Sequence, residues 1–312
     1  MKNNILLVLT ALIWGCAFVA QSVGMDYVGP FTFNMARFLI GAIVLLPVIW
    51  FMDRQWAKEQ NAEGVSGINP DTDGAAKNDP ADRKTVIIGG ICCGIALAVA
   101  STLQQWGILF TTVGKAGFIT AMYIVIVPLL GIFICKKVRP LIIGCVAIAV
   151  VGFYFLCMTE SLRLGLGDFL VLLCAIAFSI HILVIDHFSP KVDGVKMSAI
   201  QFLTAAIISA VPTLLWEQPE FTEVLQAWQP VLYAGVMSCG VAYTLQIIAQ
   251  KNADPTVASL LLSLESVFSV LAGWVLLGQG LSLKEMFGCV LIFCAIILAQ
   301  LPEKKMLKPL PV

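Results

Sequence analysis

The sequence predicts an all-α integral membrane protein with ten transmembrane helices, arranged as two inverted five-helix repeats. Three observations predict this fold. The 312-residue chain is 59% hydrophobic and only 12% charged, whereas soluble domains are roughly 45–50% apolar and about 25% charged. It contains apolar runs of about 18 residues or more, the length that spans a bilayer. Its second half repeats the residue pattern of its first half.

The apolar runs are too long and too continuous for the strands of a barrel. Backbone groups within hydrocarbon must be paired inside their own segment, so each run is expected to be a helix. In order, the expected spans are 5–22, 31–51, 85–106, 116–135, 141–158, 167–185, 197–216, 230–249, 256–277 and 283–301. The first run follows Lys2 and could be a secretory signal peptide, but its match to the sixth run favours a retained span.

The repeat is clearest at a shift of 142 positions, where Ala100–Lys137 is compared with Ala242–Gln279. Residues 37–39 align with 201–203 at a shift of 164, and residues 144–146 match 288–290 at a shift of 144. Each copy holds five spans, so the second copy must enter the membrane in the opposite direction. Inverted repeats are typical of secondary transporters, whose substrate site lies near the bilayer midplane between the copies.

The domain organisation follows from this repeat. We expect a first repeat at 1–158, a second repeat at 159–301 and a cytoplasmic tail at 302–312. The connection at about 52–84 is rich in Gly, Asp, Asn and Ala. Such a composition cannot form a core, so this segment is expected to be a disordered cytoplasmic loop.

The positive charges predict the orientation. One side of the membrane receives only Lys115, Arg163 and Lys284, and Arg37 lies inside a span, which leaves 15 of the 19 Lys and Arg on the side of the N-terminus. Cytoplasmic loops carry the excess of Lys and Arg. Both termini are therefore expected in the cytoplasm, with the protein in the cell (inner) membrane.

Several motifs resemble those of one family. These are LIWGCAF, ARFLIGA and TLQQWGILFTTVGKAGFITAMYIVIVPLLG in the first copy, and VASLLLSLESVFSVLAGWVLLGQ in the second. The chain resembles the EamA family of the drug/metabolite transporter superfamily over nearly its whole length, except for the 52–84 loop and the tail after Leu301. The resemblance implies ten helices, two EamA repeats and export or uptake of small metabolites. Ser266 stands where the family often has Pro, and the loop after span 2 is unusually long. Both departures weaken an inference about the substrate.

Glu265 is the first candidate site residue, because it lies about halfway along the ninth span. A charge at the bilayer centre is costly and usually faces a cavity or another charge. Ser259, Ser263, Ser266 and Ser269 share its face of the helix, which is too polar for lipid. Glu265 is expected to bind substrate or a proton; a structural ion pair or a packing role is the alternative.

Arg37 is the only basic residue well inside a span, and Asn34 shares its face. Arg suits a carboxylate or a phosphate because its fork donates two parallel hydrogen bonds. Alternatively, Arg37 reaches inward to Glu265 or extends outward to the membrane surface.

The remaining candidates for substrate binding are neutral. Gln104 and Gln246 occupy matching positions in the two copies, and Tyr123 occupies the position that matches Glu265. Tyr243 and Trp14 complete the set. Hydrogen bonds between helices explain such polar residues equally well, and aromatic residues also serve as packing or interface anchors.

Together these patterns predict a secondary transporter that moves a small metabolite, such as an amino acid or a nucleobase, by alternating access. Glu265 is the candidate for proton coupling. A channel-like facilitator is the alternative, and an intramembrane enzyme is disfavoured because the chain lacks HExxH, GxSxG and paired acids. The ten cysteines have no metal-ligand spacing, so no metal or other cofactor is expected. The expected partners are the substrate and the lipid bilayer, without nucleic acid, and the sequence leaves open a homodimer.

Overall fold

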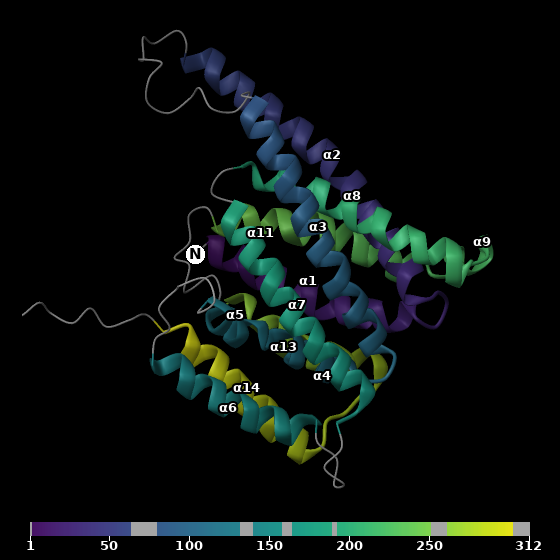
Figure 1. Ribbon diagram of the computed structural model, residues 1–312, viewed down its shortest axis with the longest axis vertical. Coiled ribbons are helices and arrows are strands. Elements are labelled where there is room, and N and C mark those ends of the chain that lie inside the picture. The colour runs from purple at the N-terminus through teal and green to yellow at the C-terminus, as the bar shows by residue number, and fades with distance from the viewer. Residues whose placement is uncertain are drawn as a thin grey trace, which may run out of the picture.

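The computed structural model describes residues 2–63, 80–131, 140–157, 164–188, 192–250 and 261–301 (Figure 1). Helices make up nearly all of these segments, and short turns join them. The prediction of an all-helical chain is confirmed.

The first half of the chain forms six helical segments. They are α1 (Lys2–Gly24), α2 (Pro30–Glu63), α3 (Pro80–Ile108), α4 (Val113–Ala121), α5 (Tyr123–Gly131) and α6 (Pro140–Cys157). Three of them begin with Pro, which suits the first helical position because its missing N–H has no partner there in any helix. Thr112 caps α4 by accepting a hydrogen bond from the backbone N–H of Lys115 at 3.4 Å.

The second half is more interrupted. Its segments are α7 (Leu166–Phe188), α8 (Gly194–Pro212), the π-helix η3 (Thr213–Glu217), α9 (Phe221–Gln226), α10 (Trp228–Leu232), the π-helix η4 (Tyr233–Ala242), α11 (Tyr243–Gln250), α13 (Leu264–Leu277) and α14 (Leu283–Ala299). Asp193 caps α8, and Ser282 and Glu285 form a capping box at the start of α14. Asp and Ser are favoured at these positions because their side chains accept from the free N–H groups of the first turn.

Among the described residues, six helices are long and apolar enough to cross a membrane. They are Asn3–Gly24, Pro30–Gln55, Arg83–Ile108, Pro140–Cys157, Leu166–Phe188 and Gly194–Glu217. Val113–Val127 and Leu264–Leu277 are shorter apolar helices. Large apolar side chains such as Ile143, Leu214 and Val275 are exposed on the surface, as expected for helices that face lipid tails. The chain is thus a multi-pass membrane protein.

The prediction of a disordered loop at 52–84 is wrong at both ends of that segment. The helix α2 continues to Glu63, and α3 already begins at Pro80. The residues after Met52 include Ala, Lys, Glu and Gln, which have high helix propensity, and extending a helix that the apolar run already forms avoids the cost of a new nucleus. Residues 64–79 lie outside the described residues.

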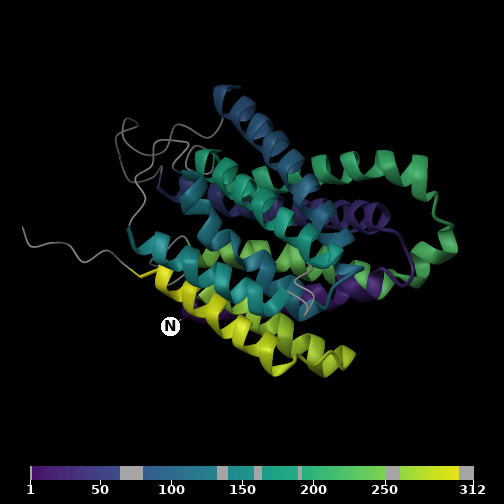
Figure 2. The same cartoon turned by 60° about the horizontal axis from the view of Figure 1, so that its bottom comes forward.

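The helices pack as the two-repeat architecture requires. The helix α2 packs against its counterpart α8, α4 packs against α13, and α6 packs against α14. The last pair lies side by side in both Figure 1 and Figure 2. The helix α1 packs against η4 and α13 of the second copy, and correspondingly α7 packs against α3 and α5 of the first. Each copy therefore completes the other.

Five groups of helix ends lie on one face, which we name the predicted outer face: residues 24–33, 106–115, 164–168, 213–223 and 278–285. Contacts between these groups place them together. Glu217 binds the start of α2, Phe31 lies 6.2 Å from Trp106, Thr111 contacts Asp168, and Lys115 pairs with Glu285. The ion pair between Lys196 and Asp53 joins the opposite ends of α8 and α2. Helix ends thus alternate between two faces along the chain.

Candidate substrate cavity

A cavity of about 350 Å³ lies between the two repeats. Its walls come from α1, α2, α3, α4 and α5 of the first copy, and from α7, α8, η4, α11, α13 and Leu262 of the second. Neither α6 nor α14 contributes a lining residue. The last span of each copy therefore supports the cavity from outside.

The lining is close to two-fold symmetric. At the shift of 164 the lining pairs are Trp14/Phe178, Ala17/His181, Phe18/Ile182, Gln21/Ile185 and Phe38/Phe202. At the shift of 142 they are Leu97/Cys239, Ser101/Tyr243, Gln104/Gln246, Thr120/Leu262 and Tyr123/Glu265. These ten pairs account for all of the 23 lining residues except Arg37, Ile124 and Ser238. The two copies thus build one cavity from equivalent positions.

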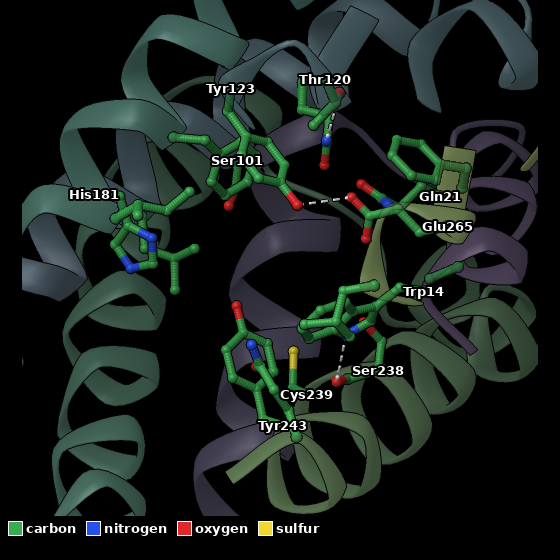
Figure 3. Close-up of a pocket in the computed structure, with 18 of the residues that line it drawn as sticks. Trp14, Gln21, Ser101, Thr120, Tyr123, His181, Ser238, Cys239, Tyr243 and Glu265 are labelled. Atoms are coloured by element: carbon green, nitrogen blue, oxygen red, sulfur yellow. Dashed lines mark hydrogen bonds between the residues drawn. The ribbon is translucent and has the colours of Figure 1, made fainter. Parts of the chain in front are cut away.

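Tyr123 and Glu265 are joined directly. The Tyr123 hydroxyl donates a hydrogen bond to Oε1 of Glu265 at 3.2 Å (Figure 3). The two residues occupy equivalent positions, so their contact lies beside the pseudo-two-fold axis. Both follow an interruption of the helix, at Met122 before α5 and at Ser263 before α13. Discontinuous helices at such positions are common at the substrate sites of transporters.

Glu265 is deeply buried and has no counter-ion among the residues that the structure describes. Its side chain is 6% exposed, and it forms no ion pair with any described residue. The alternative prediction of a structural ion pair therefore finds no partner in this part of the chain. A buried carboxylate without a cation favours neutralisation by a proton or a ligand.

Arg37 lines the same cavity and is also only 6% exposed. Its guanidinium lies 4.7 Å from the ring centre of Phe38 and 5.7 Å from that of Phe33. Its Nε has no hydrogen-bond partner, and no described carboxylate pairs with it. Arg37 neither reaches Glu265 nor extends to the surface.

Arg37 also departs from the two-fold pattern. Its counterpart Gln201 is buried outside the cavity lining, and its Oε1 lies 3.1 Å from Nε2 of His181. The first copy thus presents a cation where the second copy has a neutral amide that is already bonded. This difference places a positive charge in the part of the cavity wall that α2 forms, without an equivalent charge from α8.

A row of aromatic rings forms one wall of the cavity. Trp14 donates from Nε1 to the backbone oxygen of Ser238 at 3.2 Å, and its ring centre lies 5.2 Å from that of Tyr243 (Figure 3). Tyr243 meets Phe202 edge to face at 5.1 Å, and Phe202 stacks on Phe38 at 5.9 Å. The row ends at the ring beneath the Arg37 guanidinium. Such a wall suits a flat or apolar part of a ligand.

A profile of the EamA-like transporter family matches residues 1–158 and 165–301. The chain belongs to the EamA family. This family is part of the drug/metabolite transporter superfamily, and its match confirms the resemblance predicted from the sequence motifs.

Relatives and a solved structure agree with this assignment. An uncharacterized transporter of Archaeoglobus fulgidus is 30% identical over 296 residues, which cover 95% of this chain and 84% of that protein. The uncharacterized transporter YoaV of Bacillus subtilis is 22% identical over 298 residues, covering 92% of each chain. One protein of known crystal structure shares the fold with a TM-score of 0.61 at 19% identity, covering 96% of both chains. The EamA protein described here is therefore a membrane transporter.

The structure places most of the predicted site residues of this EamA transporter at the cavity. Trp14, Arg37, Gln104, Tyr123, Tyr243, Gln246 and Glu265 all line it. Gln104 donates from Nε2 to the Thr120 hydroxyl at 3.2 Å, so one member of the glutamine pair also ties α3 to α4.

Asn34, the remaining predicted site residue, does not line this cavity. Asn34 is fully buried but does not line the cavity, and neither polar atom of its side chain has a hydrogen-bond partner. It precedes Arg37 by three residues, which rotates its side chain about 60° away and raises it about 4.5 Å along the helix. That displacement carries Asn34 out of the cavity wall.

The serine-rich face of α13 serves packing. Ser263, Ser266 and Ser269 are all fully buried, yet none of them lines the cavity. The hydroxyl of Ser266 donates to the backbone oxygen of Ser263 at 2.9 Å, and that of Ser269 donates to the oxygen of Ser266 at 2.7 Å. This face packs against α1 and α4, so it avoids lipid as predicted while only Glu265 reaches the cavity. Ser259 lies outside the described residues.

Several lining residues of the EamA cavity were not predicted from the sequence. They include Gln21, Thr120, Phe178 and Phe202. The repeat itself carried the signal for Phe178, because shifting the predicted site residue Trp14 by 164 positions gives Phe178. Phe202 corresponds to Phe38, which also lines the cavity and was not predicted. Gln21 and Thr120 lack such a signal, since their counterparts Ile185 and Leu262 are apolar.

Proposed function

We propose that this EamA transporter is a secondary carrier for a small metabolite that bears a carboxylate group. It spans the cytoplasmic membrane with ten helices in two inverted repeats, keeps both termini in the cytoplasm and works by alternating access. The observation that carries this proposal is Arg37, a buried cation that pairs with no described carboxylate and lines a cavity built by both repeats.

A carboxylate fits Arg37 for an energetic reason. Burial of an unpaired charge costs several kcal/mol, and the cost falls when a ligand supplies the opposite charge and hydrogen bonds to the guanidinium. A dianionic phosphate fits less well, because Glu265 lines the same cavity and would repel it when ionised. Of the two substrate classes named from the sequence, amino acids carry a carboxylate and nucleobases do not.

The dimensions of the cavity agree with a small substrate. Its volume of about 350 Å³ lies at the lower end of the roughly 300–1,000 Å³ of small-molecule sites. The aromatic row beside Arg37 would cover the apolar body of such a substrate, and Gln104 and Gln246 offer neutral hydrogen-bonding groups on helices of both copies. Affinity would then come from the anion, and orientation from the rings and amides.

Alternating access is supported by the symmetry of the lining. When equivalent residues from two inverted copies enclose one cavity, rocking of the copies exposes the same residues to each side in turn. Proton coupling is supported by Glu265, a buried carboxylate whose one hydrogen-bond donor among the described residues is the Tyr123 hydroxyl. Intramembrane carboxylates of this kind often serve as proton sites in transporters.

The proposal is tested by uptake into proteoliposomes of matched pairs of compounds, each pair an amino acid and its amide. We expect the wild type to transport acids and to reject the amides. Arg37→Gln should reduce the apparent affinity for the acids by about 30-fold or more, since loss of a buried charge-assisted contact costs roughly 2–5 kcal/mol.

Arg54→Gln is the matched control. Arg54 lies on the same helix, but it is exposed and its guanidinium lies 3.8 Å from the Trp50 ring, outside the cavity. This variant should transport like the wild type. Equal transport of acids by Arg37→Gln and the wild type would refute the role of Arg37, and transport of the amides alone would refute the substrate class.

A further inference from the structure

Three polar contacts on the predicted outer face join the first repeat to the second. In the first repeat, the contacts involve the turn before α4 and the first residues of α4. In the second repeat, they involve α7, the α13–α14 connection and α14. The contacts are an ion pair of 2.7 Å between Lys115 and Glu285, a hydrogen bond of 2.9 Å from the Val113 N–H to Oε1 of Gln279, and a hydrogen bond from the Thr111 hydroxyl to Asp168.

The residues that the repeat makes equivalent to these partners have different chemistry. At the shift of 142, Thr111, Val113 and Lys115 correspond to Ala253, Pro255 and Val257, and at the shift of 144 Glu285 corresponds to Leu141. Ala has no hydroxyl, Pro has no N–H, and Val and Leu carry no charge. Residues 251–260 lie outside the described residues, and their chemistry is known from the sequence. None of the three contacts can form between these equivalent positions.

The helices α2 and α8 differ from this pattern, because a carboxylate contact joins them at both faces. On the predicted outer face the Glu217 carboxylate accepts hydrogen bonds from the N–H groups of Phe31 at 2.9 Å and Thr32 at 2.7 Å. On the opposite face Asp53, the counterpart of Glu217 at the shift of 164, pairs at 2.8 Å with Lys196, the counterpart of Thr32. A carboxylate at the end of one helix thus binds the start of the other at both faces.

We infer that the three contacts form an outer latch, defined as Thr111–Asp168, Val113–Gln279 and Lys115–Glu285, which holds the empty carrier closed on the predicted outer face. The inference rests on the alternating-access mechanism proposed above. Opening this face separates the partners, and the residue types at the equivalent positions cannot form the same three bonds when the opposite face closes. The outer latch therefore stabilises the state that is closed on the predicted outer face more than the state that is closed on the opposite face. The α2–α8 contacts instead hold those two helices together at both faces.

The size of the bias follows from the exposure of the latch. The side chains of Lys115 and Glu285 are 19% and 23% exposed, so the pair is partly shielded from water and stronger than a fully solvated pair. Removing it should shift the ratio of the two states on the order of fivefold. A shift of this size leaves the protein folded and the cavity intact.

The test measures access to Cys239, which lines the cavity, in a variant whose nine other cysteines are replaced by Ser or Ala. A membrane-impermeant maleimide is added to one side of oriented vesicles at a time. Lys115→Gln and Glu285→Gln should each raise the rate of labelling from the predicted outer side about fivefold and lower it from the other side. The swap Lys115→Glu/Glu285→Lys should return the rates toward the starting values.

Asp53→Asn/Lys196→Gln is the matched control, since it removes an ion pair of similar length on the opposite face without opening the latch. It should leave both labelling rates unchanged. Hydrogen–deuterium exchange of the protein with all its native cysteines gives a second measurement, in which Lys115→Gln should speed exchange at 109–114 and 279–284 but not at 27–33.

The results separate the latch from the transport mechanism. Labelling of Cys239 from one side only, in every variant, would overturn alternating access itself. Labelling from both sides with rates that do not respond to Lys115→Gln or Glu285→Gln, together with unchanged exchange at 109–114, would overturn the outer latch and leave the carrier mechanism standing.

Discussion

At the residue scale, the cavity holds two ionisable side chains of opposite sign that do not pair with each other. Arg37 comes from the first copy, where the second has Gln201, and Glu265 comes from the second copy, where the first has Tyr123. Duplication alone would give a cavity with the same chemistry at both ends. Each copy has instead acquired one charge, so the substrate meets a cation and an acid at separate places.

This separation gives Glu265 a role of its own. We expect Glu265→Gln to abolish accumulation of substrate driven by a pH gradient, because the amide cannot take up or release a proton. Exchange of substrate across the membrane without a gradient should continue within about tenfold of the wild-type rate, since Gln keeps the size and the hydrogen-bond acceptor for Tyr123. Gradient-driven uptake and counterflow in the same proteoliposomes measure the two effects.

Two further variants make this result specific. Glu220→Gln changes an exposed carboxylate at the start of α9 and should leave both activities unchanged. Tyr123→Phe removes one hydrogen bond of 3.2 Å while keeping the carboxylate, so it should lower gradient-driven uptake only several-fold. Full gradient-driven accumulation by Glu265→Gln would rule out proton coupling through this residue.

At the element scale, α6 and α14 approach each other closely through two glycines. A Cβ added to Gly288 would lie 2.6 Å from the backbone nitrogen of Leu156 and 2.7 Å from the backbone oxygen of Gly152. Small residues let helix backbones come together in membranes, where packing and not hydrophobicity drives association. The equivalent glycine of the first copy, Gly144, meets nothing within 4 Å.

This contrast predicts opposite effects of the same substitution. Gly288→Ala should destabilise the protein by about 1–3 kcal/mol, because backbone atoms cannot move aside for the added methyl group. Gly144→Ala should be neutral or slightly stabilising, since the helix gains a residue of higher propensity in open space. Thermal unfolding in detergent measures both, with Gly288→Ala several degrees lower.

The same pair of variants distinguishes a role of α6 and α14 in stability from a role in substrate binding. Because α6 and α14 contribute no lining residue, neither substitution should alter the apparent affinity of the folded carrier for its substrate. An unchanged melting temperature for Gly288→Ala would show that these helices are less tightly packed than the structure describes.

Two strong signals in the sequence predicted the helices, namely the length of the apolar runs and the repeat. The repeat alignment brought Tyr123 to the position of Glu265, and the structure joins them by a hydrogen bond. It did not reveal the helix break at Met122 or the π-helix Tyr233–Ala242, because these depend on packing between helices and not on local composition. Composition misled at the end of α2, where polar helix formers continue a helix beyond the apolar run.

The position of Asn34 outside the cavity lining has a different cause. The sequence pattern shows which residues share a helix face. Residues three positions apart, such as Asn34 and Arg37, still differ by about 60° around the helix axis, so one can line a cavity while the other packs against a neighbouring helix. Only the positions of the neighbouring helices decide between Arg37, which lines the cavity, and Asn34, which does not.

At the scale of the whole molecule, the two copies interlock, and their contacts divide the helices into two groups. The helices α2 and α8 are joined at both faces by Glu217 and by the Asp53–Lys196 pair. The start of α4 is joined to α14 on the predicted outer face by Lys115 and Glu285. Rocking of the copies should therefore keep α2 and α8 in contact and separate the start of α4 from α14.

Reversible cross-linking tests this division. We prepare Asp53→Cys/Lys196→Cys and Lys115→Cys/Glu285→Cys in a background from which the native cysteines are removed, and we join each pair with a bifunctional methanethiosulfonate reagent. The cross-link between α4 and α14 should reduce transport at least tenfold, because the predicted outer face can no longer open. The cross-link between α2 and α8 should leave transport within about twofold of the untreated protein, because these ends do not separate during the cycle.

Reduction of the cross-linked protein provides the internal control, since it should restore transport in the α4–α14 variant to the rate before treatment. The cysteine-free background treated with the same reagent reports any loss that is unrelated to the two pairs. Equal inhibition by both cross-links would mean that α2 and α8 also part during transport. Inhibition by neither would mean that substrate crosses without opening the predicted outer face at α4 and α14, and the cavity would then have to open to that face between other helices.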